Sequence, residues 1–155
     1  NWGMHIIQPV VGLAKSRVKR VFGQLQQTIN PGDADDNFLA VLEFENGIRG
    51  VAEFTQSPHP FPGFVIQGTE GTIITNSESV TVKQANPKQP GEVQSTSYPL
   101  VGKPFGDEAH LYRDIAANLL NEPPYPTPPE LALEGTKILD AVRRSHELGQ
   151  TVELR

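Results

Sequence analysis

Hydrophobic positions along the chain follow two spacings, and the change from one to the other outlines the fold. Apolar residues recur at helical spacing near the start, over residues 4–15, and again near the end, over residues 109–120 and 131–145. Between these segments, short apolar runs alternate with polar residues and are separated by glycine, proline and asparagine. The pattern therefore predicts helices at both ends of the chain and strands between them.

The clearest strand pair is a hairpin in the first half of the chain. Residues 37–45 and 48–56 flank Asn46-Gly47, the strongest short signal for a two-residue hairpin turn. One face of the pair carries Leu39, Val41 and Val51, although the other face already supplies apolar residues for a core. An antiparallel sheet with one solvated face should alternate more cleanly. We therefore expect this second face to be partly covered by another subunit.

The remaining strands are shorter. They are expected at 17–27, 64–67, 71–75, 79–83, 96–101 and 151–154, with residues 86–95 as a mobile loop. Strands that are followed by helices indicate an α+β fold, here a two-layer one, with an open, mainly antiparallel sheet of about six strands and helices packed on one face. The length of 155 residues suits one domain, so residues 1–155 are expected to form a single domain.

The two C-terminal helices have strong end signals. Asp107 can cap the first helix, and the prolines from Pro123 onwards stop it. Thr127 to Glu130 has the form of a capping box with proline at the first helical position. Gly149 is placed to end the second helix in a left-handed conformation.

Composition removes several classes of function. The net charge of −5 argues against a nucleic-acid partner, which requires clustered positive charge. The absence of cysteine excludes disulfides and thiolate chemistry. No apolar run reaches the roughly 20 residues of a membrane span, and no signal peptide is present, so we expect no membrane partner and a cytoplasmic location. The acidic loop at residues 29–36 does not have the spacing of an EF-hand, which favours a solvated loop over a calcium site.

Candidate chemistry is sparse. The sequence contains neither a phosphate-binding GxxxxGK[ST] loop nor a GxGxxG after a strand. Among the histidines, His5 is of interest because Asn1 and His5 stand four residues apart on one side of a helix start. Such a pair could present a hydrogen-bond donor and a general acid or base to a substrate hydroxyl. A purely structural histidine is the alternative. The chain begins with Asn1 and runs straight into the first helical pattern, so we expect it to be a fragment of a longer protein.

Three stretches resemble one family. The ending LYRDIAANLLNEPPYPTPPELALEGTKILDAVRRSHELGQTVEL looks like the closing helix pair and last strand of the glucose–fructose oxidoreductase / inositol dehydrogenase (Gfo/Idh/MocA) family. The middle, FLAVLEFENGIRGVAEFTQS and then FVIQGTEGTII, is similar to that family's hairpin and glycine turn. The start, Asn1-Trp2-Gly3-Met4-His5, resembles its Asp-x-Gly-x-His. The chain as a whole is similar to the C-terminal domain of these NAD(P)-dependent oxidoreductases.

The resemblance implies a fold, a role and two site residues. The fold is like the C-terminal domain of glyceraldehyde-3-phosphate dehydrogenase. An N-terminal Rossmann domain, absent from this chain, would bind NAD or NADP, and the fragment alone would bind no cofactor and no metal. His5 matches the family's catalytic histidine, whereas Asn1 stands where an aspartate is usual and Gln8 where a second acidic residue is common. The expected partners are a sugar or polyol substrate, the protein's own Rossmann domain and further copies of the chain through the open sheet face. Because asparagine cannot take a proton, a non-catalytic assembly domain is the alternative function.

Overall fold

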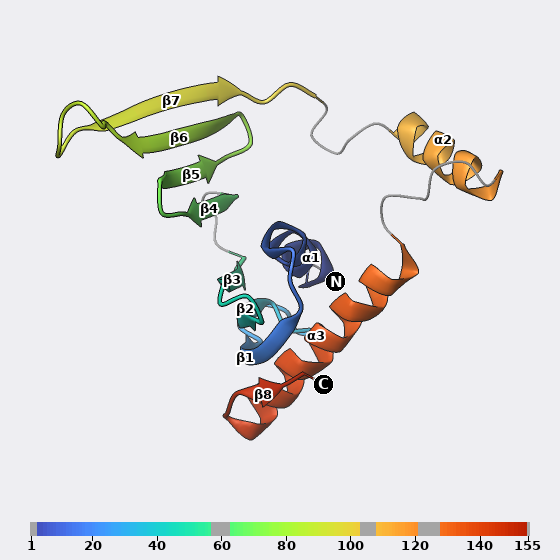
Figure 1. The fold of residues 1–155 in the computed structure, drawn as a ribbon. Helices are drawn as coiled ribbons and strands as arrows, with labels where there is room; N and C mark the ends of the chain where they lie inside the picture. The colour runs from blue at the N-terminus through green and yellow to red at the C-terminus, as the bar shows by residue number, and fades with distance from the viewer. Residues whose placement is uncertain (1–2, 57–62, 103–107, 121–127, 155) are drawn as a thin grey trace. The chain divides into compact units, whose positions relative to one another are not determined.

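The computed structural model describes residues 3–56, 63–102, 108–120 and 128–154. Its helices are α1 (Gly3–Ala14), α2 (Glu108–Leu119) and α3 (Pro129–Leu148) (Figure 1). Its strands are β1 (Val18–Gln26), β2 (Asn37–Phe44), β3 (Arg49–Phe54), β4 (Phe64–Gln67), β5 (Gly71–Thr75), β6 (Ser79–Ala85), β7 (Val93–Pro99) and β8 (Val152–Glu153). They form two four-stranded antiparallel sheets, in the orders β3-β2-β1-β8 and β4-β5-β6-β7. The predicted α+β class is confirmed, and the strands are divided between two sheets.

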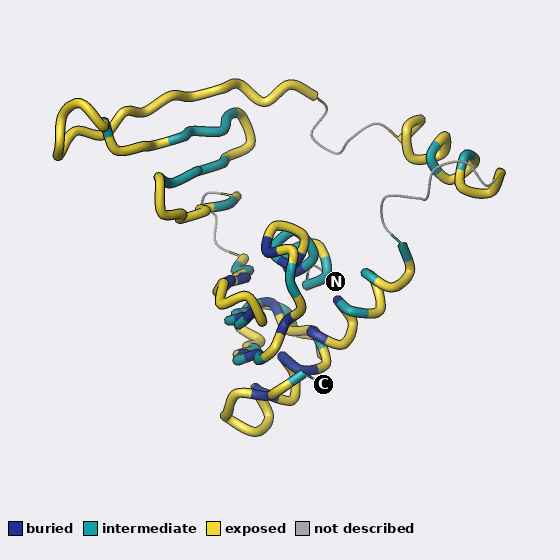
Figure 2. The backbone as a smooth tube through the Cα atoms, viewed as in Figure 1, coloured by how far each residue is buried: buried dark blue, intermediate teal, exposed yellow. Residues whose placement is uncertain are grey.

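The chain divides into two compact units, which are described separately. The first, residues 1–56 and 120–155, holds α1, β1, β2, β3, α3 and β8. The second, residues 57–119, holds β4 to β7 and α2. Every buried residue among those that the structure describes belongs to the first unit (Figure 2).

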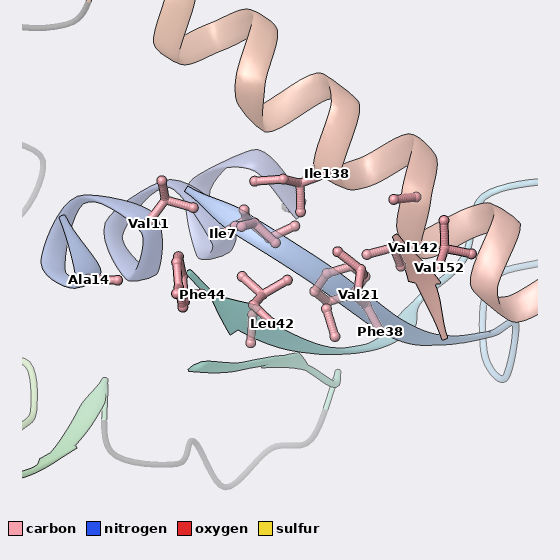
Figure 3. Packing of buried hydrophobic residues seen from close by; sticks show 14 residues of the cluster. Ile7, Val11, Ala14, Val21, Phe38, Leu42, Phe44, Ile138, Val142 and Val152 are labelled. Carbon is pink, nitrogen blue, oxygen red and sulfur yellow. The ribbon is translucent and has the colours of Figure 1, made fainter. Parts of the chain in front are cut away.

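The core of the first unit forms on one face of its sheet. Strand β2 alternates regularly between buried and half-buried positions, as the hairpin pattern predicts. Its buried residues are Phe38, Ala40, Leu42 and Phe44. Helices α1 and α3 lie together over this face, and Figure 3 shows Ile7 and Ile138 in the space where both helices meet the strands. Burial of apolar area in this cluster is the main contribution that holds α1 in place.

Helix α3 begins and ends near the residues that the sequence indicates. Pro129 occupies its first turn, Pro128 is the extended residue before it, and no side chain caps the helix there. Thr127, the expected capping residue, lies outside the described residues, as does Asp107. Gly149 ends the helix with φ of 64°, in the left-handed region that glycine favours. The chain then returns as β8, which pairs with β1.

The sheet of the second unit is an antiparallel meander with β7 as an edge strand. The sequence places this strand at 96–101 and a loop before it, but β7 already begins at Val93. The difference arises because Val93 to Pro99 pairs along the full length of β6, and this pairing extends the strand beyond what local composition indicates.

Helix α2 is amphipathic, but it has no buried residue. Its apolar side chains Leu111, Tyr112, Ile115 and Leu119 are all exposed. The helices in the described part of the chain are all too short or too polar to cross a membrane.

Candidate active site

His5 lies in the first turn of α1, which begins at Gly3. Ile7 and Val11 of the same helix are buried against the sheet, whereas the side chain of His5 is exposed. Because residues on the buried and exposed sides of a helix differ by about half a turn, the packing of α1 directs His5 away from the core. Asn1, its expected partner, lies outside the described residues, so their pairing stays a prediction.

Two contacts with α3 hold the turn that carries His5. The terminal atoms of Met4 lie over Gly135, where an added Cβ would come within 2.6 Å of Cε and 2.8 Å of Sδ. Leu139 lies over Gly3 in the same way, with Cδ2 only 2.7 Å from the position of an added Cβ. The first turn of α1 is therefore packed closely on the middle of α3, at Gly135 and Leu139.

Pro9 lies inside α1, and the helix continues through it. A residue in this position would normally donate its backbone N–H to the carbonyl four residues earlier, which is that of His5. Proline has no N–H to donate, and its ring crowds that carbonyl. Pro9 therefore contributes no backbone hydrogen bond to the first turn of α1.

The acidic loop between β1 and β2 is organised around one carboxylate. Asp36 is 1% exposed, and its two oxygens accept hydrogen bonds from the backbone N–H groups of Thr28 (2.7 Å), Ile29 (2.6 Å) and Asn30 (2.7 Å) and from the Thr28 hydroxyl (2.7 Å). These bonds, that from Asn30 foremost, hold the pKa of Asp36 well below its ordinary value. All its acceptor positions serve the loop, so the carboxylate is a structural anchor.

The described residues contain no group of three or more histidine, aspartate or glutamate side chains arranged to hold a metal ion. His146 lies in the last turn of α3, and its Nδ1 accepts a long hydrogen bond of 3.4 Å from the N–H of Leu25. His110 lies in α2 with its Nδ1 2.8 Å from a guanidinium nitrogen of Arg113. His59 lies outside the described residues.

The surface of the described residues includes the following two hollows. One, of about 420 Å³, lies beside α3 and is lined by residues that include Arg17, Glu134 and Lys137. The other, of about 320 Å³, lies on the second unit over Ile66 and the glycine turn at residues 68–71. His5 lines neither hollow.

Sequence reasoning selected His5 but missed the residues that hold it. Gly135 is a small residue in the interior of a long helix, a position that glycine destabilises unless close packing requires it. The glycine within the helix is thus a sequence signal for close packing at this position. The sequence does not reveal that the side chain packed against Gly135 is that of Met4.

Residues 3–154 match the family described as "Oxidoreductase family, C-terminal alpha/beta domain". The chain belongs to this family, the Gfo/Idh/MocA C-terminal domain family. No curated protein matches the sequence.

Solved structures share the fold. An NAD-binding protein from Listeria innocua is 26% identical, with a TM-score of 0.78 over 99% of this chain and 46% of its own. The yvaA protein of Bacillus subtilis is 16% identical, with a TM-score of 0.83 over 99% of this chain and 50% of its own. An NAD binding oxidoreductase from Klebsiella pneumoniae is 16% identical, with a TM-score of 0.77 over 99% and 49%. The chain thus spans about half the length of the structures that it matches.

Proposed function

We propose that this chain is the substrate-binding and oligomerisation domain of an NAD(P)-dependent oxidoreductase that acts on a hydroxyl group of a sugar or polyol. The observation that carries the proposal is the family match over residues 3–154, together with an exposed histidine on the first turn of α1. The coverage of about half of each similar structure is consistent with a second domain elsewhere in the protein. A cytoplasmic location is part of the same proposal.

The proposed chemistry gives His5 the role of general base. When it is bound, a nicotinamide supplies the acceptor for a hydride. The neutral imidazole of His5 would accept the hydroxyl proton as the carbon–hydrogen bond breaks, and it would return that proton in the reverse reaction. Asn1 would orient the hydroxyl through its amide, since it can donate and accept hydrogen bonds but cannot take the proton. The chain contains no GxGxxG fingerprint after a strand, so the proposal assigns the cofactor to a separate Rossmann domain.

The test is oxidation of sugars and polyols by the full-length protein with NAD⁺ or NADP⁺, followed by the absorbance of the reduced nicotinamide. We expect one substrate class to be oxidised. Calorimetry on the 155-residue chain alone should show no heat of NAD(H) binding. Strong cofactor binding by this chain, or inactivity of the full-length protein across the panel, would contradict the proposal.

The second candidate is an assembly domain without chemistry. It is favoured by the face of β1, β2 and β3 opposite the core. Val41 lies there between Phe22 and Val51 on the neighbouring strands, and Val51 is 61% exposed. The two candidates differ in turnover, because an assembly domain requires this face and does not require His5.

A further inference from the structure

The position of His5 depends on contacts outside its own helix. Pro9, four residues after His5, has no N–H to donate to the His5 carbonyl. Met4 and Gly3, the two residues before His5, both contact α3. The packing of these two residues therefore contributes to the position of the turn that carries His5.

The packing is reciprocal. A glycine of α3, Gly135, receives the end of Met4 from α1, and a glycine of α1, Gly3, receives the end of Leu139 from α3. Each helix thus presents a long side chain to a glycine on the other. Such an arrangement lets two helices approach closely and opposes sliding or rotation of one against the other.

Backbone conformation does not explain the glycine in α3. Gly135 is buried in the interior of a 20-residue helix and is absent from the residues with positive φ. Glycine there costs about 1 kcal/mol relative to alanine. The atoms that an added Cβ would meet are Sδ and Cε of Met4, at the flexible end of that side chain, so a larger residue at position 135 must displace the end of Met4.

We infer that Gly135 is a positioning residue for the proposed active site: it seats Met4 and thereby fixes the first turn of α1 and the direction of His5. This inference rests on the proposed role of His5. Gly135 lies 130 residues from His5 in sequence and acts through Met4, so it need not touch the substrate.

The experiment replaces Gly135 by leucine, which is a good helix former and fills the space that Met4 occupies. The matched control is Ala132→Leu, on an exposed position of the same helix. NMR of the 155-residue chain reports the imidazole resonances of His5. We expect these resonances to shift in Gly135→Leu and to stay unchanged in Ala132→Leu.

Kinetics in the full-length protein provide the second readout. Gly135→Leu should lower kcat by roughly tenfold to a hundredfold with a smaller change in KM, because misplacing a reacting group by about 1 Å has effects of this size. A merely structural role would lower the melting temperature without displacing the His5 resonances of the folded protein.

Rescue separates positioning from general damage. The double variant Gly135→Leu with Met4→Ala exchanges a large and a small residue across the contact and roughly conserves its volume. It should recover the His5 resonances and most of kcat. Gly135→Ala gives a milder version, with a partial shift, that can be measured if Gly135→Leu does not fold.

The outcomes distinguish the two proposals. If His5→Ala leaves turnover unchanged, the proposed function fails. The shift of the His5 resonances in Gly135→Leu then still tests whether Gly135 positions His5 through Met4. If His5→Ala abolishes turnover but folded Gly135 variants keep the His5 resonances and kcat of the unmodified protein, the positioning inference is overturned. Failure of Met4→Ala to rescue a folded Gly135→Leu variant would also overturn it.

Discussion

At the scale of single residues, the structure uses its buried polar groups to shape backbone. Three aspartates in one short loop left a cation site open as an alternative on the sequence alone. The structure shows that Asp36 is buried and holds three successive N–H groups of the chain. The burial of Asp36 could not be predicted from the sequence, because the same composition fits a solvated loop, a cation site or a loop folded around its own carboxylate.

Asp36 makes the free energy of unfolding depend on pH in the acid range. Its pKa is lowered in the folded chain by hydrogen bonds to the carboxylate, so the folded state binds this proton less readily than the unfolded state. The resulting stabilisation is fully present above the ordinary aspartate pKa of about 3.9 and is lost as the pH falls below it.

Asp36→Asn should therefore lower the melting temperature by several degrees at neutral pH, and the difference from the unmodified chain should narrow at acid pH. Asp33→Asn, at an exposed position of the same loop, is the control. Thermal unfolding between pH 7 and pH 3 measures both. A difference that is constant across this range would contradict the role given to the carboxylate.

At the scale of elements, the sequence predicts most of the helices and strands because their local signals agree. The Asn46-Gly47 turn, Gly149 and the alternation in β2 each indicate the element that forms. What it cannot predict is how α3 meets β1. A Cβ on Gly23 would lie 2.6 Å from the carbonyl oxygen of Val142, so this contact requires glycine in a strand. The two residues are 119 positions apart, and no local pattern joins them.

Ser145 of α3 forms a second contact with β1, through hydrogen bonds of its side chain. Its hydroxyl accepts a hydrogen bond of 2.9 Å from the N–H of Gly23 and donates one of 2.6 Å to the carbonyl of Gln150. Strand β8 pairs with β1 at Arg20 and Val21, and Ser145 accepts the N–H of Gly23, which lies beyond that pairing on the same edge of β1. The helix thereby satisfies a backbone group that no strand reaches.

Ser145→Ala should lower the free energy of unfolding by about 1–3 kcal/mol, because it leaves the buried N–H of Gly23 without its acceptor. Thr136→Ala is the control: its exposed hydroxyl bonds back to Ala132 of the same helix, and its loss should cost less than about 0.5 kcal/mol. Urea denaturation compares the two. Equal effects would show that the hydroxyl of Ser145 adds nothing specific.

At the scale of the whole molecule, the sequence anticipates the open face but not the ion pair beside it. Arg20 of β1 and Glu43 of β2 approach to 2.7 Å, and their hydrogen bond raises the pKa of Arg20 and lowers that of Glu43. An apolar centre with a charged pair at its border is the usual composition of a protein interface. This arrangement supports the proposal that further copies of the chain cover the face.

Val51→Lys tests that assembly. Placing a charge on this face, at an exposed position of the edge strand β3, should convert dimers or larger oligomers of the 155-residue chain into monomers, as measured by light scattering at high concentration. Val93→Lys is the control, since Val93 is similarly exposed, at 66%, on β7 of the other sheet. A monomeric unmodified chain, or oligomers that survive Val51→Lys, would contradict the proposal.

The proposed oxidoreductase reaction depends on His5. The most direct measurement is kcat/KM of the full-length protein with the alcohol substrate that it oxidises. The unmodified protein is compared with His5→Ala and with a control, His110→Ala, at an exposed position of α2. Loss of a general base predicts a decrease of roughly 10²–10⁴-fold in His5→Ala and no change in the control. Unchanged turnover in a folded His5→Ala protein would contradict the account.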